Sequence, residues 1–116
     1  MDTLLVILRK PPYGTTDAAE AVRHAGGASG FDYNAILYLI DSGVYAAKKN
    51  QDAGDTDFLG LGESLELLSD EMEIYVNKDS LIAYSIKEDN IIEGVKIDNG
   101  DVLKQALKDS QTVMIY

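Results

Sequence analysis

The chain has 116 residues, 46% of them hydrophobic, with only 10 glycines and 2 prolines, so its composition is that of one globular domain over residues 1–116. It has no cysteine and one histidine, His24, which excludes disulfides, thiol nucleophiles and cysteine or multi-histidine metal sites. The net charge of −10 disfavours nucleic acid and anionic membranes as direct partners, because their phosphates would be repelled. We expect a cytoplasmic protein, because neither a basic leader nor an apolar run of about 20 residues is present. We also expect no cofactor.

Short apolar runs separated by turn or helix signals predict the strands. Residues 3–8 are continuously apolar, which is typical of a central parallel strand buried on both faces. Because helical segments alternate with the apolar runs, we predict an α/β fold with a mostly parallel sheet covered on both faces. The expected strands occupy residues 3–8, 35–40, 72–76, 94–97 and 112–116.

The segments between the strands carry helix signals. Thr15 or Thr16 can cap the first helix, and the pair Gly26-Gly27 is its expected stop signal. His24 then falls in the last turn, where we interpret it as a surface or C-capping residue rather than a catalytic base. Further helices are expected over 44–47, 63–68, 81–84 and 102–107, and the polar residues 50–57 are the expected mobile loop.

Polar side chains just beyond the carboxyl ends of strands are the first candidates for a functional site, because parallel α/β sheets bind ligands there. Asp41 directly follows the second strand, Tyr45 lies a few residues further on, and Tyr13 lies in the loop after the first strand. Spacing ties no second carboxylate, histidine or metal motif to Asp41, so capping of the following turn is its favoured interpretation. No phosphate-binding glycine fingerprint follows the first strand. The residues alone indicate no catalytic constellation.

Three segments, taken in order, carry a resemblance to a known family. They are PYGT at residues 12–15, LIDSGVY at 39–45 and VMIY at 113–116. With an alanine-rich helix between the first two, the chain resembles the DsrE/DsrF-like family over nearly its whole length. Within that family it is most similar to the DsrF-like, or TusC-type, subunit of the intracellular sulfur relay.

The resemblance implies a three-layer α/β/α fold with about five strands, and assembly into trimers, hexamers or heteromers of related subunits. Such complexes pass persulfide sulfur between proteins, for tRNA 2-thiouridine synthesis or for sulfur oxidation. Carrier members have a cysteine in the loop after the third strand, at a position that falls on or beside Asn77 here. Since an amide cannot form a persulfide, the resemblance implies a non-catalytic subunit that packs against a related, cysteine-bearing one.

Our first hypothesis is therefore a structural subunit of a sulfur-relay complex, with Tyr13, Asp41, Tyr45 and Asn77 in the cleft that faces the neighbouring subunit. The alternative is a stand-alone homo-oligomer of the same fold that binds a small ligand at the strand ends. A third hypothesis is an enzyme that uses the Asp41 carboxylate with the hydroxyl of Tyr13 or Tyr45, which no fixed spacing supports.

Overall fold

The computed structural model describes residues 2–12, 14, 16–49 and 61–116. Five strands form one sheet in the order β4-β3-β2-β1-β5, and every neighbouring pair is parallel. The prediction of a mostly parallel sheet is confirmed. The strands are β1 (Thr3–Leu8), β2 (Asn34–Leu39), β3 (Glu73–Asn77), β4 (Lys96–Asp98) and β5 (Thr112–Ile115).

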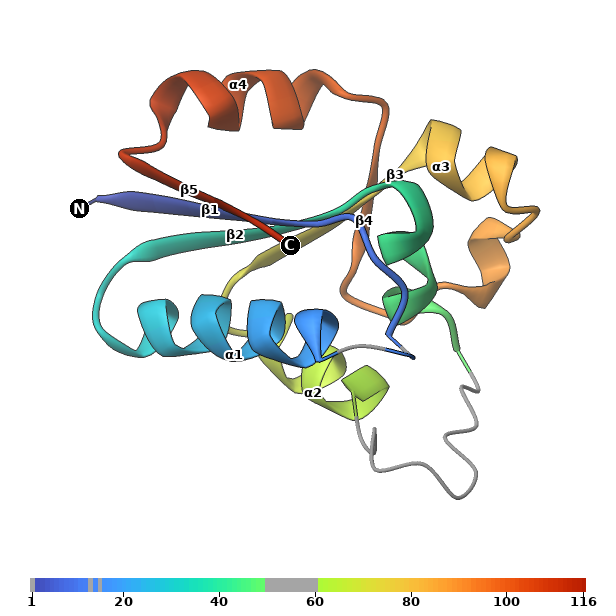
Figure 1. The fold of residues 1–116 in the computed structure, drawn as a ribbon, viewed down its shortest axis with the longest axis horizontal. Helices are drawn as coiled ribbons and strands as arrows, with labels where there is room; N and C mark the ends of the chain where they lie inside the picture. The colour runs from blue at the N-terminus through green and yellow to red at the C-terminus, as the bar shows by residue number, and fades with distance from the viewer. Residues whose placement is uncertain (1, 13, 15, 50–60) are drawn as a thin grey trace.

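Helices cover both faces of the sheet, which gives the three-layer arrangement (Figure 1). On one face lie α1 (Asp17–Gly30) and α2 (Leu61–Leu68), and on the other lies α4 (Asp101–Asp109). The carboxyl ends of β2 and β3 lead directly into the 3₁₀ helix η1 (Asp41–Ala47) and into α3 (Lys78–Ala83). A second 3₁₀ helix, η2 (Glu88–Asn90), follows α3.

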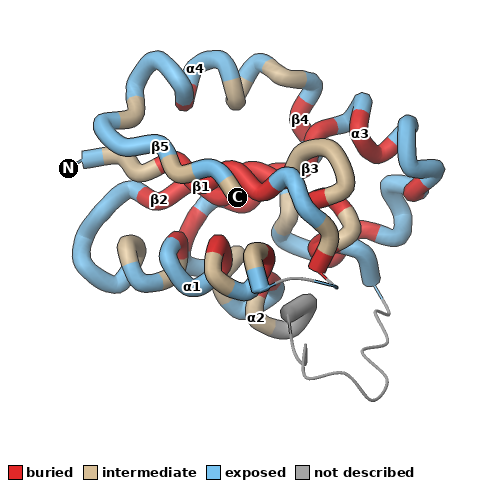
Figure 2. The backbone as a smooth tube through the Cα atoms, viewed as in Figure 1, coloured by how far each residue is buried: buried red, intermediate tan, exposed pale blue. Residues whose placement is uncertain are grey.

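The core lies on both sides of the sheet, because successive side chains of a strand point to opposite faces. The buried strands run through the centre of the molecule in Figure 2. On the α1 face, Val6, Leu37 and Ile74 are fully buried within the larger apolar cluster. The smaller cluster on the α4 face consists of Leu5, Ile7, Ile36, Tyr38, Tyr75 and Ala106.

Helix α1 continues through the glycine pair that was expected to end it, so that prediction was wrong. The helix runs on to Gly30. A Cβ atom on Gly26 would lie 3.3 Å from a methyl carbon of Leu68, so the missing side chain lets α1 lie close against α2. The glycine at this position serves packing rather than termination.

The ends of α1 differ from expectation in two further respects. Thr16 is the residue before the helix, but its side chain makes no capping hydrogen bond. His24 lies in the body of the helix, so the C-capping interpretation was wrong, although the residue is exposed as expected. Its Nδ1 is hydrogen-bonded to the hydroxyl of Tyr116, and the two rings stack with centroids 5.7 Å apart. This contact links α1 to the residue after β5.

Element boundaries near the carboxyl end of the sheet also differ from the sequence prediction. The strand β3 includes Asn77, which was expected in the following loop, and α3 begins at once at Lys78. The strand β4 begins at Lys96 rather than at residue 94, because Gly94 has a φ of +92° and forms a turn. The expected loop over residues 50–57 lies outside the described residues.

Candidate functional site

A chain of buried hydrogen bonds crosses the carboxyl ends of β2, β3 and β4. The Tyr38 hydroxyl donates to Oδ2 of Asp98 at 2.7 Å, and Nδ2 of Asn77 donates to the same hydroxyl oxygen at 3.2 Å. Tyr38 is 0% exposed, Asn77 8% and Asp98 6%. The strand register pairs Asn77 with Asp98 on adjacent strands, which brings these polar groups side by side. A buried polar group is stable only with such partners.

The chain extends from Asn77 to Asp41 through Ser80. Oδ1 of Asn77 accepts hydrogen bonds from the backbone N–H of Ser80 at 3.0 Å and from its hydroxyl at 3.1 Å, and so caps α3. The Ser80 hydroxyl oxygen in turn accepts from the backbone N–H of Asp41 at 2.9 Å. The structure therefore joins two predicted site residues, Asp41 and Asn77, through a third that the sequence prediction missed. The spacing Asn-x-x-Ser, which is that of a cap and the third helical residue, is the signal that could have found Ser80.

At the other end of the chain, Asp98 fixes the start of α4. Its carboxylate accepts from the backbone N–H groups of Gly100, Val102 and Leu103 at 3.0, 3.2 and 3.4 Å. Together with Tyr38, these donors satisfy a buried carboxylate at the positive end of a helix dipole. Sequence reasoning placed residues 98–100 only between the fourth strand and the last helix, and it missed Asp98 as part of the site.

The pKa values of Asp98 and Tyr38 follow from burial and hydrogen bonding. Burial alone would raise the pKa of Asp98, but the hydrogen bond from Tyr38 and those from the α4 backbone outweigh it and leave the pKa below its ordinary 3.8. Burial raises the pKa of Tyr38 well above 10.0; the hydrogen bond from Asn77 lowers it in part, and Asp98 raises it again. At neutral pH the pair is a tyrosine hydroxyl donating to a carboxylate.

Asp41 has a left-handed backbone conformation, and its side chain forms a weak ion pair. Its φ of +54° lies in the left-handed region, and its Oδ2 accepts from Nε of Arg9 at 3.1 Å. Both side chains are about half exposed or more, at 62% for Arg9 and 49% for Asp41, so the pair contributes less than about 1 kcal/mol. Two residues on, a Cβ on Gly43 would lie 2.1 Å from the carbonyl oxygen of Leu8, so only glycine lets η1 lie against β1.

The two predicted tyrosines have different outcomes. Tyr45 lies in η1, is half-buried, and meets Tyr84 edge to face with ring centroids 5.4 Å apart. Tyr84 directly follows α3, so this contact fastens η1 to α3 beside the Asp41–Ser80 bond. Tyr13 lies outside the described residues. The structure thus gathers Asp41, Tyr45 and Asn77 around η1 and α3.

This arrangement is a structural hydrogen-bond network in which the amide of Asn77 is occupied at both ends. Within the described part of the chain, no group of three or more His, Asp or Glu side chains is arranged to hold a metal ion. Nor does any described helix have the length and apolar character to cross a membrane.

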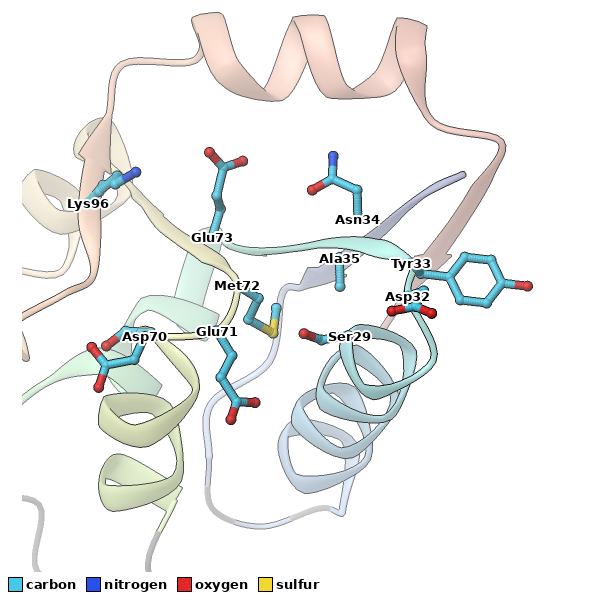
Figure 3. A pocket seen from close by; sticks show the side chains of 11 residues that line it. Ser29, Asp32, Tyr33, Asn34, Ala35, Asp70, Glu71, Met72, Glu73 and Lys96 are labelled. Atoms are coloured by element: carbon cyan, nitrogen blue, oxygen red, sulfur yellow. The ribbon is translucent and has the colours of Figure 1, made fainter. Parts of the chain in front are cut away.

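A hollow of about 510 Å³ lies at the opposite, amino end of the sheet (Figure 3). There Asn34 and Glu73 point toward the side of the sheet that carries α4, whereas Ala35 and Met72 point toward the α1 side. Lys96 is the basic residue of its lining. The acidic residues of the lining are Asp32, Asp70, Glu71 and Glu73.

The sheet order, the all-parallel pairing and the helices on both faces define a three-layer α/β/α protein of the doubly wound class. The chain belongs to the DsrE/DsrF-like family, whose sequence model matches residues 2–116. The family resemblance carried by the PYGT and DSGVY segments is confirmed.

Individual relatives agree with this assignment. The chain is 32% identical over 87 residues to the intracellular sulfur oxidation protein DsrF of Allochromatium vinosum; the match covers 73% of this chain and spans 64% of that protein. It is also 32% identical to an uncharacterized protein of Methanocaldococcus jannaschii, with 96% of each chain covered.

Solved structures share the fold at low sequence identity. The crystal structure of the ychN protein from E. coli matches with a TM-score of 0.89 at 20% identity, covering 100% of both chains. A protein of unknown function from Methanobacterium thermoautotrophicum matches with a TM-score of 0.74 at 10% identity, again over the full length of both. These similarities concern the fold alone.

Proposed function

We propose that this chain is a non-catalytic subunit of an intracellular, cytoplasmic sulfur-relay complex, assembled with related DsrE/DsrF-like subunits of which one bears the reactive cysteine. The observation that carries the proposal is a full-length match to this family by a sequence that contains no cysteine. A similar protein, DsrF, is named for intracellular sulfur oxidation. Without a thiol, the chain has no group that forms a persulfide.

The family resemblance places the cysteine of carrier subunits on or beside Asn77, and the surroundings of Asn77 support a structural role there. The side chain caps α3 through its oxygen and holds the Tyr38 hydroxyl through its nitrogen. Only 8% of the residue is exposed. A group that is bonded on both sides and buried stabilises the fold and offers little surface to a reacting partner.

The surface around α3 is where we propose that the neighbouring subunit binds. Ile82 is 67% exposed and Tyr84 is 40% exposed, although both are large and hydrophobic. Tyr84 packs on Tyr45, and η1 begins at Asp41, so the proposed site residues border this apolar surface. Exposed aromatic and aliphatic side chains of this kind are typical of the central part of protein interfaces.

Co-purification from the native host tests the proposal. The tagged wild-type chain should retain a related subunit that contains a cysteine. Ile82→Lys should lose most of that subunit, because a charge in an interface core must be desolvated without a partner. Ile115→Lys is the matched control, since Ile115 is 63% exposed on β5, an edge strand that β1 and β2 separate from β3, the strand that leads into α3. It should retain the subunit.

Three results would contradict parts of the proposal. A wild-type chain recovered as a lone monomer at physiological concentration excludes complex membership. A homo-oligomer that recovers no other subunit and is stabilised against heat by a small ligand establishes the alternative function. If Ile82→Lys and Ile115→Lys lose the related subunit to the same extent, the proposal that this subunit binds at α3 is contradicted.

A further inference from the structure

The turn between β4 and α4 contains the dipeptide Asn99-Gly100, which the proposed function does not use. We propose that Asn99 is a self-modification site, at which the backbone nitrogen of Gly100 displaces the side-chain amide and leaves aspartate or isoaspartate. Asn99 is exposed. Gly100 has a φ of +116° and no side chain that could hinder access to its backbone nitrogen.

Two hydrogen bonds prepare the reacting groups. The N–H of Gly100, whose nitrogen is the nucleophile, donates to the carboxylate Oδ2 of Asp98 at 3.0 Å. This carboxylate is placed to receive the proton that the nitrogen gives up. The backbone N–H of Asp101 donates to Oδ1 of Asn99 at 3.2 Å, and this oxygen gains negative charge when the carbonyl carbon is attacked. Nucleophile, proton acceptor, oxyanion donor and the attacked side chain thus all lie within the four consecutive residues 98–101.

The reaction balances without any oxidant or reductant. A bond forms between Cγ of Asn99 and the nitrogen of Gly100, and the bond from Cγ to Nδ2 breaks. Nδ2 leaves as ammonia and carries away the proton lost by Gly100. Water then opens the five-membered imide. Cleavage at Cγ gives aspartate, and cleavage at the main-chain carbonyl gives isoaspartate, in which the backbone runs through Cβ and Cγ.

Isoaspartate has a structural consequence that aspartate lacks. The main chain gains one carbon between residues 99 and 100, just before the N–H groups of Gly100, Val102 and Leu103 that bind Asp98. Those groups shift relative to the carboxylate, which remains fixed on β4 and bonded to Tyr38. The isoaspartate form should therefore hold α4 less firmly to the sheet.

Prolonged incubation of the folded full chain in mildly alkaline buffer at physiological temperature, followed by trypsin and mass spectrometry, tests the site. Asn99 is alone among asparagines in peptide 97–104, as Asn34 is in 24–48 and Asn90 in 88–96. Residues with a side chain, Ala35 and Ile91, follow the two reference asparagines. We expect peptide 97–104 to exchange its amide for a carboxyl in a growing fraction of the chains while both reference peptides keep theirs.

Thermal unfolding separates the two products. The isoaspartate fraction should melt several degrees below the variant Asn99→Asp, which has the same charge and an unaltered backbone. Asn99→Ser should show no conversion in this peptide. The proposal is overturned if peptide 97–104 keeps its amide throughout, if the reference peptides convert as fast, or if the isoaspartate fraction melts with Asn99→Asp.

Discussion

The two ends of the sheet hold carboxylates in opposite ways. At the carboxyl end Asp98 is buried, and a tyrosine hydroxyl and three backbone N–H groups bind it. At the amino end Asp70, Glu71 and Glu73 are exposed around an open hollow. A buried carboxylate that loses its donors is costly, whereas an exposed one is solvated by water. The comparison predicts that polar substitutions change stability strongly at one end and weakly at the other.

Asp98→Ala should have the largest effect. It removes the acceptor of four hydrogen bonds and leaves the Tyr38 hydroxyl buried without its carboxylate, so we expect unfolding to become easier by about 3 kcal/mol. Urea denaturation measures the change. Asp70→Ala, an aspartate of the amino end, is the control and should stay within about 0.5 kcal/mol. Equal effects of the two substitutions would contradict the comparison.

Acidification should reproduce part of the loss of stability that Asp98→Ala causes. Because the folded-state pKa of Asp98 lies below 3.8, its stabilising contribution is complete above that pH and is lost as the pH falls through the folded-state pKa. We expect the free energy of unfolding of the wild type to decrease in this range. The decrease should be smaller in Asp98→Ala. If both proteins lose stability equally below pH 3.8, other carboxylates cause the acid sensitivity.

Tyr38→Phe should have the next largest effect, about 2 kcal/mol, because Nδ2 of Asn77 loses its acceptor and Asp98 loses one donor. The pKa of Tyr38 is raised in the folded state, so the unfolded chain deprotonates first and wild-type stability should fall as the pH rises above 10.0. The fall should be smaller in Tyr38→Phe. It should not vanish, since burial, and after it Glu73, also raises the pKa of Tyr75.

Tyr33→Phe is the matched control at the amino end. Tyr33 lines the hollow and is 47% exposed. Its substitution should leave both the free energy of unfolding and the alkaline fall within about 0.5 kcal/mol of the wild type. A comparable loss in this variant would show that burial of the hydroxyl is not what distinguishes the two positions.

Asn77→Ala should cost about 1.5 kcal/mol, since it removes the cap of α3 and the donor to Tyr38. Asn77→Asp keeps a capping oxygen but gives up the amide donor and places a second carboxylate near Asp98. Urea denaturation of both variants separates the two functions of the amide. If Asn77→Asp is as stable as the wild type, the bond to Tyr38 contributes nothing measurable.

Sequence reasoning found the parts of this structure that depend on local pattern. The continuous apolar run of β1 identifies it as a central strand whatever surrounds it, and strand–helix alternation is enough for a parallel sheet. The sequence also indicated Asp41, because it follows the second strand, whereas Asn77 was indicated only by the family resemblance. The signals for the strands and for Asp41 lie within a few residues of the features that they predict.

The missed features depend on partners that are distant in sequence. Asp98 binds a tyrosine 60 positions earlier in the chain, and nothing in residues 98–100 distinguishes such a carboxylate from an ordinary turn residue. Gly26 resembles a helix terminator until Leu68 is placed beside it. The local pattern predicts the helices and strands. Which polar groups and glycines the fold requires becomes visible only when these elements are packed together.

Glu71→Gln should have the smallest effect. The residue is exposed at the acidic hollow of a chain with net charge −10, so removing its charge relieves repulsion. We expect the free energy of unfolding to stay constant or to rise by up to about 0.5 kcal/mol at low salt, and the gain to disappear at high salt. A loss above about 1 kcal/mol would mean that this carboxylate, like Asp98, is held by donors on which the fold depends, and the contrast between the two ends would no longer stand.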